Sequence, residues 1–274
     1  MKIAFQGEPG AYSEAAVIEH YPGQSVTPVP CPSFEQVFAA VTGGACDCGF
    51  IPIENSLAGS IHQNYDLLLR NELWVVGEHR LRVSHCLIAR PGARLDQITK
   101  VISHPQALAQ CEGYLRSLPG VQVEPVYDTA GSVKMISESA DPSVAAIASR
   151  RAAQLYGMDI LAENIEDNPA NFTRFLIISP QPAVLAETGE NARTSIVFTL
   201  KNQPGSLFRA LGAFALRDID LTKLESRPLV GKPWEYLFYV DFTGAATDPV
   251  VQRALAHLSE YAHMLRVLGS YPVA

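Results

Sequence analysis

The sequence lacks any long hydrophobic run, any cluster of basic residues and any paired cysteine motif. No segment reaches the roughly 18 uninterrupted apolar residues of a membrane helix, and the N-terminus has no apolar stretch typical of a signal peptide. We therefore expect the protein to stay in the cytoplasm. Lys and Arg number 21 against 28 Asp and Glu, a net charge of −7 without a basic run, so nucleic acid is not an expected partner.

The five cysteines predict neither disulfides nor a metal site. The only close pair is Cys46-Asp47-Cys48, which lacks the C-x-x-C spacing and a second pair to complete a zinc site, while Cys31, Cys86 and Cys111 are scattered. We expect reduced thiols and no metal or cofactor. With 274 residues, 47% of them hydrophobic and 18% charged, the chain can form two folded domains.

The first 180 residues alternate short apolar strands with helices, which predicts an α/β domain with a largely parallel sheet. Strands are predicted at Lys2–Phe5, Gly49–Ile53, Leu73–Val76, Leu81–Val83, Val101–Ser103, Pro125–Tyr127 and Val144–Ala148. Polar groups follow several of them, at the carboxyl ends where such sheets bind ligands. Gly7 and Gly10, after the first strand, suit either an anion at a helix start or a plain tight turn.

The stretch Asn171–Phe175 places three polar side chains directly before the apolar run Leu176–Ile178. A polar cluster that leads into a core strand needs partners, and a polar ligand is one way to supply them. Arg174 offers a fork of donors that suits a carboxylate, and Thr173 offers a hydroxyl. The alternative is a Thr that caps its own backbone and an Arg paired with a nearby Asp.

The C-terminal part reads as a compact βαββαβ module that follows the polar connector Glu187–Asn191. Its elements are predicted at Ser195–Leu200, Pro204–Leu216, Leu221–Pro228, Tyr236–Val240, Pro249–Tyr261 and Leu265–Gly269. We find no nucleotide fingerprint, metal cluster or catalytic triad in it. Dimerisation is therefore its default role.

Together these motifs resemble those of the prephenate dehydratase family over nearly the whole chain, with an ACT regulatory domain at the C-terminus. The residues that carry the resemblance are Gly7–Ser13, Pro52–Ser56, Ser103–Leu108, Asp128–Ala130, Asn171–Phe175, Asn202–Gly205 and Glu225–Pro228. The resemblance implies a two-lobed α/β catalytic domain similar to type 2 periplasmic binding proteins, followed by an α+β ACT domain. The expected boundaries are 1–180 (lobe one about 1–77 and 165–180, lobe two about 78–164), a linker at 181–193, and 194–274.

The activity that the resemblance implies is removal of water and CO2 from prephenate to give phenylpyruvate in phenylalanine biosynthesis, by a carbon–oxygen lyase that needs no cofactor. Feedback by phenylalanine and a homodimer or homotetramer are also implied. Neither end shows a chorismate mutase or dehydrogenase segment, so we expect one catalytic activity. An arogenate dehydratase and a non-catalytic anion sensor are the alternatives, and Gly131-Ser132 leaves the choice of substrate open.

The family's essential threonine corresponds to Thr173, for which we expect a hydrogen bond to the departing hydroxyl. Glu54, His104 or a water are alternative proton donors, and Arg174 holds a substrate carboxylate or pairs with protein. Further substrate-binding candidates, each of which could instead cap a helix, are Asn55, Ser56, Ser103, Gln106, Gln110 and Thr129. Phe175 completes the set, although Phe172 and Phe175 are typical of a core. Phenylalanine is expected to bind between Asn202, Gln203, Pro204, Gly205, Ser206, Leu207 and Glu225, Ser226, Arg227, Pro228.

Overall fold

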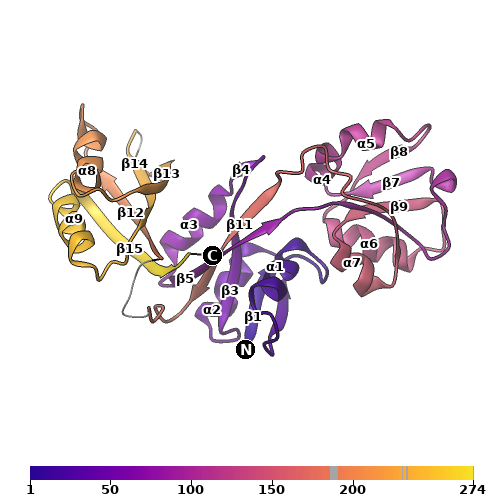
Figure 1. The fold of residues 1–274 in the computed structure, drawn as a ribbon, viewed down its shortest axis with the longest axis horizontal. Helices are drawn as coiled ribbons and strands as arrows, with labels where there is room; N and C mark the ends of the chain where they lie inside the picture. The colour runs from indigo at the N-terminus through magenta and orange to yellow at the C-terminus, as the bar shows by residue number, and fades with distance from the viewer. Residues whose placement is uncertain (186–190, 230, 233, 274) are drawn as a thin grey trace. The chain divides into compact units, whose positions relative to one another are not determined.

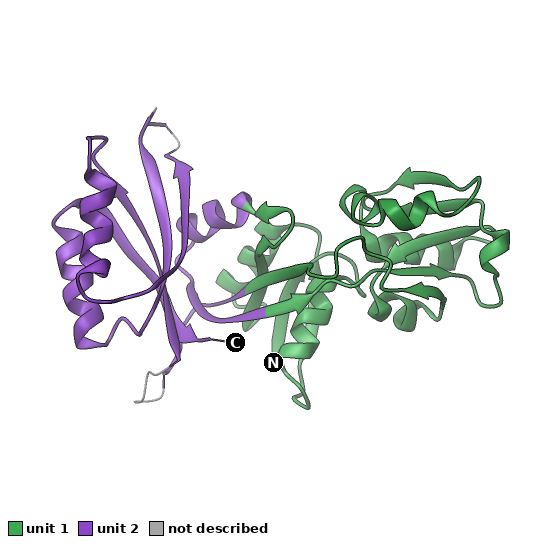
Figure 2. Cartoon of the chain, turned by 45° about the horizontal axis from the view of Figure 1, so that its top comes forward, with its two compact units in different colours: residues 1–61, 80–175 green, residues 62–79, 176–274 purple. Residues whose placement is uncertain are grey.

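The computed structural model describes residues 1–185, 191–229, 231–232 and 234–273. It contains three β-sheets and the helices labelled in Figure 1. Two compact units divide the chain, residues 1–61 with 80–175 and residues 62–79 with 176–274 (Figure 2). In the described part, no helix is both long and apolar enough to cross a membrane.

The first sheet has the strand order β2-β1-β3-β11-β5, and β4 pairs with β3. Its strands are β1 (Lys2–Gln6), β2 (Thr27–Cys31), β3 (Cys48–Asn55), β4 (Gly59–Ser60), β5 (Trp74–Arg82) and β11 (Phe172–Ser179). Helices α1 (Tyr12–His20) and α2 (Phe34–Thr42) contact β1 and β3. Ser33 begins α2, because its hydroxyl accepts a hydrogen bond from the Gln36 N–H at 3.4 Å. Ile3, Phe5 and Phe50, on β1 and β3, are among the buried residues of this sheet.

The second sheet, in the first unit, has the order β10-β6-β9-β7-β8. Its strands are β6 (Cys86–Ala89), β7 (Lys100–Ser103), β8 (Gln122–Pro125), β9 (Val144–Ala148) and β10 (Asp159–Glu163). Figure 1 shows α4 (Pro105–Gln110) and α5 (Glu112–Arg116) on one face and α6 (Thr129–Glu138) and α7 (Arg150–Tyr156) on the other. β7 runs parallel to β8 and β9, whereas β6 is antiparallel to β9 and β10. The expected α/β lobes are confirmed, with this sheet mixed rather than largely parallel.

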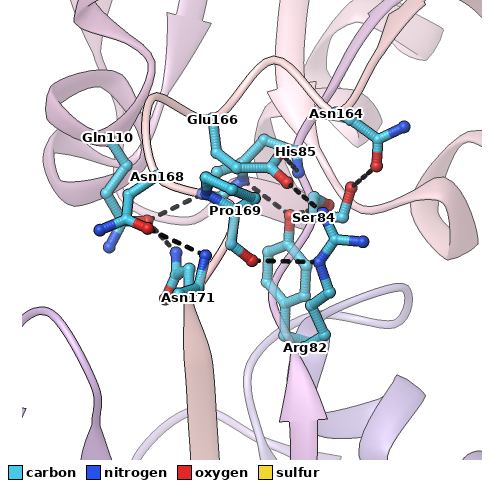
Figure 3. A network of polar contacts seen from close by, with 11 residues as sticks. Arg82, Ser84, His85, Gln110, Asn164, Glu166, Asn168, Pro169 and Asn171 are labelled. Atoms are coloured by element: carbon cyan, nitrogen blue, oxygen red, sulfur yellow. Dashed lines mark hydrogen bonds and ion pairs between the residues drawn. The ribbon is translucent and has the colours of Figure 1, made fainter.

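Two chain crossings connect the lobes, and they lie side by side. The N–H of Val83 donates to the carbonyl of Asn171 at 2.8 Å, and the N–H of Ile165 donates to the carbonyl of His85 at 3.1 Å. The carboxylate of Glu166 accepts from the His85 N–H and from Arg82, at 2.9 and 3.2 Å (Figure 3). These bonds fix the backbone on which part of the site is built.

Gly10 is a further point at which the two lobes contact each other. Its φ is +91°, and a Cβ on it would lie only 2.9 Å from the Cα of Ala152 in α7. The hydroxyl of Ser149 donates to its carbonyl at 2.7 Å. Gly10 therefore serves close packing in a tight turn, while Gly7 (φ +122°) lines a separate cavity with Glu8 and other residues.

The second unit contains the βαββαβ module and the segment His62–His79. The module's elements are β12 (Ala192–Leu200), α8 (Ser206–Ala215), β13 (Leu221–Pro228), β14 (Tyr236–Thr243), α9 (Pro249–Ser259) and β15 (Ala262–Pro272), with the sheet order β13-β14-β12-β15. Its core packs α8 and α9 on the sheet through buried residues such as Phe198, Phe214 and Phe242. The predicted module is confirmed, because its alternating strands and amphipathic helices bury one face each.

Helix α3 (His62–Arg70) belongs to the second unit rather than to the first. The guanidinium of Arg266 donates to carbonyls at its C-terminal end, the shortest contact being 2.7 Å to Asn71. Glu78 and Arg193 form a buried ion pair, in which Nη1 lies 2.6 Å from both carboxylate oxygens. Polar contacts thus attach this segment to the βαββαβ module.

Three of the predicted strands differ in the structure. Most of Leu73–Val76 and Leu81–Val83 belongs to one strand, β5 (Trp74–Arg82), which continues through the residues between them, where Gly77 and Glu78 are both buried. The strand predicted at Pro125–Tyr127 is wrong, since β8 ends at Pro125 and Tyr127 is exposed. The predicted connector Glu187–Asn191 lies outside the described residues except for its last one.

Candidate active site

A cavity of about 190 Å³ lies in the first unit, where β3 ends and β11 begins. The residues that line it are Tyr12, Ser13, Pro52, Asn55, Ile61, Val83, His85, His104, Gln106, Ala107, Gln110, Thr129, Thr173 and Phe175. No Asp, Glu, Lys or Arg is among these described lining residues. Any anion held here would therefore meet neutral donors and helix N-termini.

Thr173 and Asn55 meet across neighbouring strands. The Asn55 amide nitrogen donates to the Thr173 hydroxyl oxygen at 3.1 Å, to the Phe172 carbonyl at 3.2 Å and to the Asn171 side-chain oxygen at 2.8 Å. Within the described residues the Thr173 hydroxyl makes no other hydrogen bond. Its oxygen is thus occupied by a donor, and its proton remains available to a ligand.

A chain of side-chain hydrogen bonds continues from Asn171. The Asn171 amide nitrogen donates to the Gln110 side-chain oxygen at 3.1 Å, and Nε2 of His85 lies 2.8 Å from that same oxygen (Figure 3). Nδ1 of His85 lies 2.7 Å from the Tyr12 hydroxyl, which is also 2.9 Å from the carbonyl of Ser84. The cavity wall therefore holds its polar groups in one connected network.

Burial keeps the two titratable members of this network uncharged. Loss of solvation lowers the pKa of His85 below its ordinary 6.5, a shift that the Gln110 hydrogen bond and nearby Glu166 only oppose. The same loss of solvation raises the pKa of Tyr12 well above its ordinary value, with further contributions from neighbouring cysteines and Glu166. Both side chains act here as neutral hydrogen-bonding groups.

His104 and Thr129 stand at the starts of two helices on the cavity. Nδ1 of His104 accepts a hydrogen bond from the Gln106 N–H at 3.2 Å, so His104 caps α4. This nitrogen carries no proton in that arrangement, which leaves the Nε2–H as a donor. Thr129 is the first residue of α6, which is capped by Asp128 through the Gly131 N–H.

Four of the predicted site residues do not line the cavity. Arg174 is buried, with Nη1 3.5 Å from an oxygen of Glu54. The hydroxyl of buried Ser103 donates to the carbonyl of Ile147 at 2.6 Å, and Ser56 bonds the backbone at Ala170 and at Phe172. These groups brace the strands and loops that carry the site.

Tyr12, Ser13 and His85 line the cavity but were not among the predicted site residues. Tyr12 and Ser13 follow the glycine turn at the start of α1, so helix position was the signal that could have found them. His85 lies between two strands in a short polar break, and its partners are distant in sequence. The described residues contain no group of three or more His, Cys, Asp or Glu placed to hold a metal ion, and the five cysteines are free thiols.

The two predicted effector motifs differ in what they contact. Asn202, Gln203, Ser206 and Leu207 line a cavity of about 110 Å³ together with Leu200, Lys201, Trp234, Tyr236 and Phe238. Glu225 and Arg227, on β13, instead pair with His62 and Asp66 of α3 at 3.1 and 3.3 Å. In the second motif, Glu225 and Arg227 thus contact helix α3, whereas Ser226 and Pro228 pair with Phe238 and Tyr236 of the cavity lining.

Comparison with known proteins gives consistent matches. A sequence model described as prephenate dehydratase matches residues 3–183, and one described as ACT domain matches residues 194–259. The chain is 49% identical over 282 residues to arogenate dehydratase/prephenate dehydratase 2, chloroplastic, of Arabidopsis thaliana, which covers 100% of this chain and 73% of that protein.

Among the solved structures that match nearly the whole chain are the following two. One is a prephenate dehydratase from Arthrobacter aurescens in complex with L-Phe, with a TM-score of 0.90 at 34% identity, covering 99% of this chain and 90% of that one. The other is described as a novel type of quorum quenching acylase, with a TM-score of 0.93 at 40% identity. The match covers 100% of this chain and 98% of that one.

Proposed function

Because the chain belongs to the prephenate dehydratase family and carries a C-terminal ACT domain, we propose that it converts prephenate to phenylpyruvate under control by phenylalanine. The observation that carries this proposal is the Thr173 hydroxyl, whose oxygen accepts from Asn55 and whose proton faces no acceptor among the described residues. A donor in this state suits a departing hydroxyl group.

The reaction uses that donor as follows. The bond from the ring to its carboxylate breaks and releases CO2, and the electron pair completes the aromatic ring as the C–O bond to the 4-hydroxyl breaks. The departing oxygen takes one proton and leaves as water. Thr173 donates a hydrogen bond to this oxygen as charge develops on it. A threonine hydroxyl is a very weak acid, so the proton itself comes from another donor, either a water or the Nε2–H of His104, whose Nδ1 is held as an acceptor.

The substrate's carboxylates are held by neutral donors. Ser13 and Thr129 lie in the first turns of α1 and α6, where the helix dipole favours negative charge. Gln106 adds a side-chain amide. Arg174 acts indirectly, since its pairing with Glu54 stabilises the strand beside Thr173.

Acyl transfer, suggested by one solved relative, fits this site less well. It needs a nucleophile with a base within hydrogen-bond reach. Across the described residues, none of the cavity hydroxyls of Ser13, Thr129 and Thr173 is hydrogen-bonded to a histidine. The cavity hydroxyl that does lie beside a histidine belongs to Tyr12, and burial raises its pKa well above the ordinary value, which makes it a poor nucleophile. Thr173 has the Asn55 amide as its partner, and that amide donates rather than accepts.

For regulation, we propose that phenylalanine binds at the loop Asn202–Leu207 and that α3 connects this domain to the catalytic site. Gly205, at φ +79°, begins α8 without a side chain and suits a carboxylate. The contacts of Glu225 and Arg227 with α3 support the link, because α3 directly follows Ile61 of the active-site cavity. A coupling of about 1–3 kcal/mol is expected.

Several further properties stay proposals. We propose the boundaries 1–180, 181–193 and 194–274, which the two family matches support. The homodimer or homotetramer stays a prediction. The cytoplasmic location also stays a prediction, because relatives are named as chloroplastic. Size-exclusion chromatography with light scattering, with and without phenylalanine, tests the assembly.

The deciding experiment measures turnover of prephenate and of arogenate by the purified chain, beside Thr173→Val and Thr173→Ser. Thr173→Val keeps the shape and removes the hydroxyl, whereas Thr173→Ser keeps the hydroxyl. We expect prephenate turnover that falls by about 10²- to 10⁴-fold only in Thr173→Val. Binding of both substrates without turnover would instead identify a sensor, and turnover of arogenate alone would identify an arogenate dehydratase.

A further inference from the structure

The side-chain oxygen of Gln110 is held by one donor from each of the two crossings between the lobes. Asn171 donates to it at 3.1 Å, and Nε2 of His85 lies 2.8 Å away (Figure 3). The Gln110 amide nitrogen makes no hydrogen bond within the described part of the chain, although Gln110 lines the cavity. The group that Gln110 offers to a ligand is therefore its NH2.

The direction of the network is set at Asn55. Its side-chain oxygen accepts from the backbone N–H groups of Leu57 and Ala58 at 3.0 and 2.9 Å, and its NH2 faces the Phe172 carbonyl. Turning this amide over would place its oxygen against a carbonyl and its NH2 against two N–H groups. Asn55 must therefore donate to the oxygen of Asn171, and the Asn171 NH2 must then donate to Gln110.

The same logic fixes the tautomer of His85. Because the Gln110 oxygen is an acceptor, Nε2 of His85 carries the proton and Nδ1 accepts from the Tyr12 hydroxyl. If every hydrogen bond of the network ran in the opposite direction, the Tyr12 hydroxyl would have to donate to the Ser84 carbonyl, which lies 2.9 Å away, instead of to His85. Because that carbonyl is available as an acceptor, the hydrogen bonds could reverse their direction if Asn171 no longer donated to Gln110.

We propose that Gln110 is a specificity-determining residue that presents only donors to the substrate, with Asn171 and His85 as its positioning residues. This inference rests on the proposed function. The donor face selects the keto oxygen of prephenate over the ammonium group of arogenate. The cavity supports this selection independently, because none of its described lining residues carries a carboxylate to pair with an ammonium. In the hydrogen-bonded network, Asn55 and Asn171 lie between Gln110 and Thr173, so the two donors are separate groups on the same cavity.

The first test compares kcat/KM for both substrates in Gln110→Glu and Asn171→Asp. Gln110→Glu replaces the NH2 by an oxygen of similar size, and Asn171→Asp removes the donor that holds the amide, so that the amide turns over. We expect kcat/KM for prephenate to fall by about 10- to 100-fold in each variant, the effect of one hydrogen bond to a polar substrate group. For arogenate, kcat/KM stays unchanged or rises.

The matched control is Asn168→Asp, in the same loop. Asn168 is exposed, and its side-chain oxygen accepts from the Ala170 N–H at 2.9 Å, a bond that Asp keeps (Figure 3). This substitution adds the same negative charge without contacting Gln110. The ratio of kcat/KM for the two substrates should therefore not change. If Gln110→Glu left the ratio of kcat/KM for prephenate to kcat/KM for arogenate unchanged, the proposal would be overturned.

The second test does not depend on turnover, so it separates this inference from the proposed function. Nitrogen-15 NMR of the histidine-labelled protein reports which ring nitrogen of His85 is protonated. We expect protonated Nε2 in the native protein and protonated Nδ1 in Asn171→Asp. Protonated Nδ1 in the native protein would overturn the proposal even if the enzyme is active.

Discussion

Asn55→Asp tests how the active-site threonine is controlled, because it changes one group and keeps the shape. The new carboxylate still accepts from the N–H groups of Leu57 and Ala58. It can no longer donate to Thr173, at 3.1 Å, or to Asn171, at 2.8 Å. The hydroxyl proton of Thr173 then turns to the carboxylate and is lost to the substrate.

The expected losses in rate and in stability differ in size. Losing a positioned donor lowers kcat by about 10²- to 10⁴-fold, which is about 2.7–5.5 kcal/mol in the barrier. The buried NH2 has two protons, and two lost hydrogen bonds cost about 1–3 kcal/mol of unfolding free energy. Thr173 and Asn171 can both turn to donate to the carboxylate, which offsets part of that cost. The variant therefore stays folded while its activity falls.

The assay is phenylpyruvate formation from prephenate, followed by its ultraviolet absorbance in alkali, with urea unfolding of the same samples. Asn71→Asp is the matched control, because it loses one NH2 donation, to the Leu67 carbonyl at 2.8 Å, away from the cavity. Combining Asn55→Asp with Thr173→Val should add little to either change alone, since both remove the same donor. A folded Asn55→Asp with kcat within about threefold of native would refute the reasoning.

Three further changes test the packing and electrostatics of the fold. Gly10→Ala should lower the unfolding free energy in urea by at least about 2 kcal/mol, because of the positive φ and the 2.9 Å approach to Ala152; a neutral effect would contradict the close packing. Glu78→Ala should cost about 3–5 kcal/mol, since it leaves buried Arg193 uncompensated, and Glu78→Gln should cost less; equal losses would show that charge is unimportant there. Burial lowers the pKa of His85 in the folded state, so as pH falls the unfolded chain binds a proton at this residue before the folded chain does. The contribution of neutral His85 to the unfolding free energy is therefore complete above pH 6.5 and is lost as the pH falls below that value. His85→Gln should flatten that part of the pH profile, measured by thermal unfolding across this range.

The elements of the fold were largely predictable from local patterns. Alternating strands such as Leu221–Pro228 and amphipathic helices such as Pro249–Ser259 follow from residue periodicity, because one face must be buried. The grouping of α3 with the C-terminal module was not predictable. It depends on Arg266 and Glu78, whose partners lie more than a hundred residues away in sequence.

The candidate site divides in the same way. The polar cluster at Asn171–Thr173 and the motif at Asn55 marked it, because polar groups at strand ends need partners. Ser103 and Arg174 fitted the same pattern, yet one bonds a core carbonyl and the other pairs with Glu54. A side chain's type limits what it can bind, and only its neighbours decide what it does bind.

The sequence by itself determined the α/β and βαββαβ elements, the family resemblance and the hydroxyl at Thr173, because these depend on periodicity and on short contiguous motifs. The tertiary structure decided which groups face the cavity and in which direction their protons point. That direction starts at the N–H groups of Leu57 and Ala58 and reaches His85 through amides from three separate parts of the chain. An amide or an imidazole has two hydrogen-bonding ends of opposite character, and its orientation is set by all of its partners together.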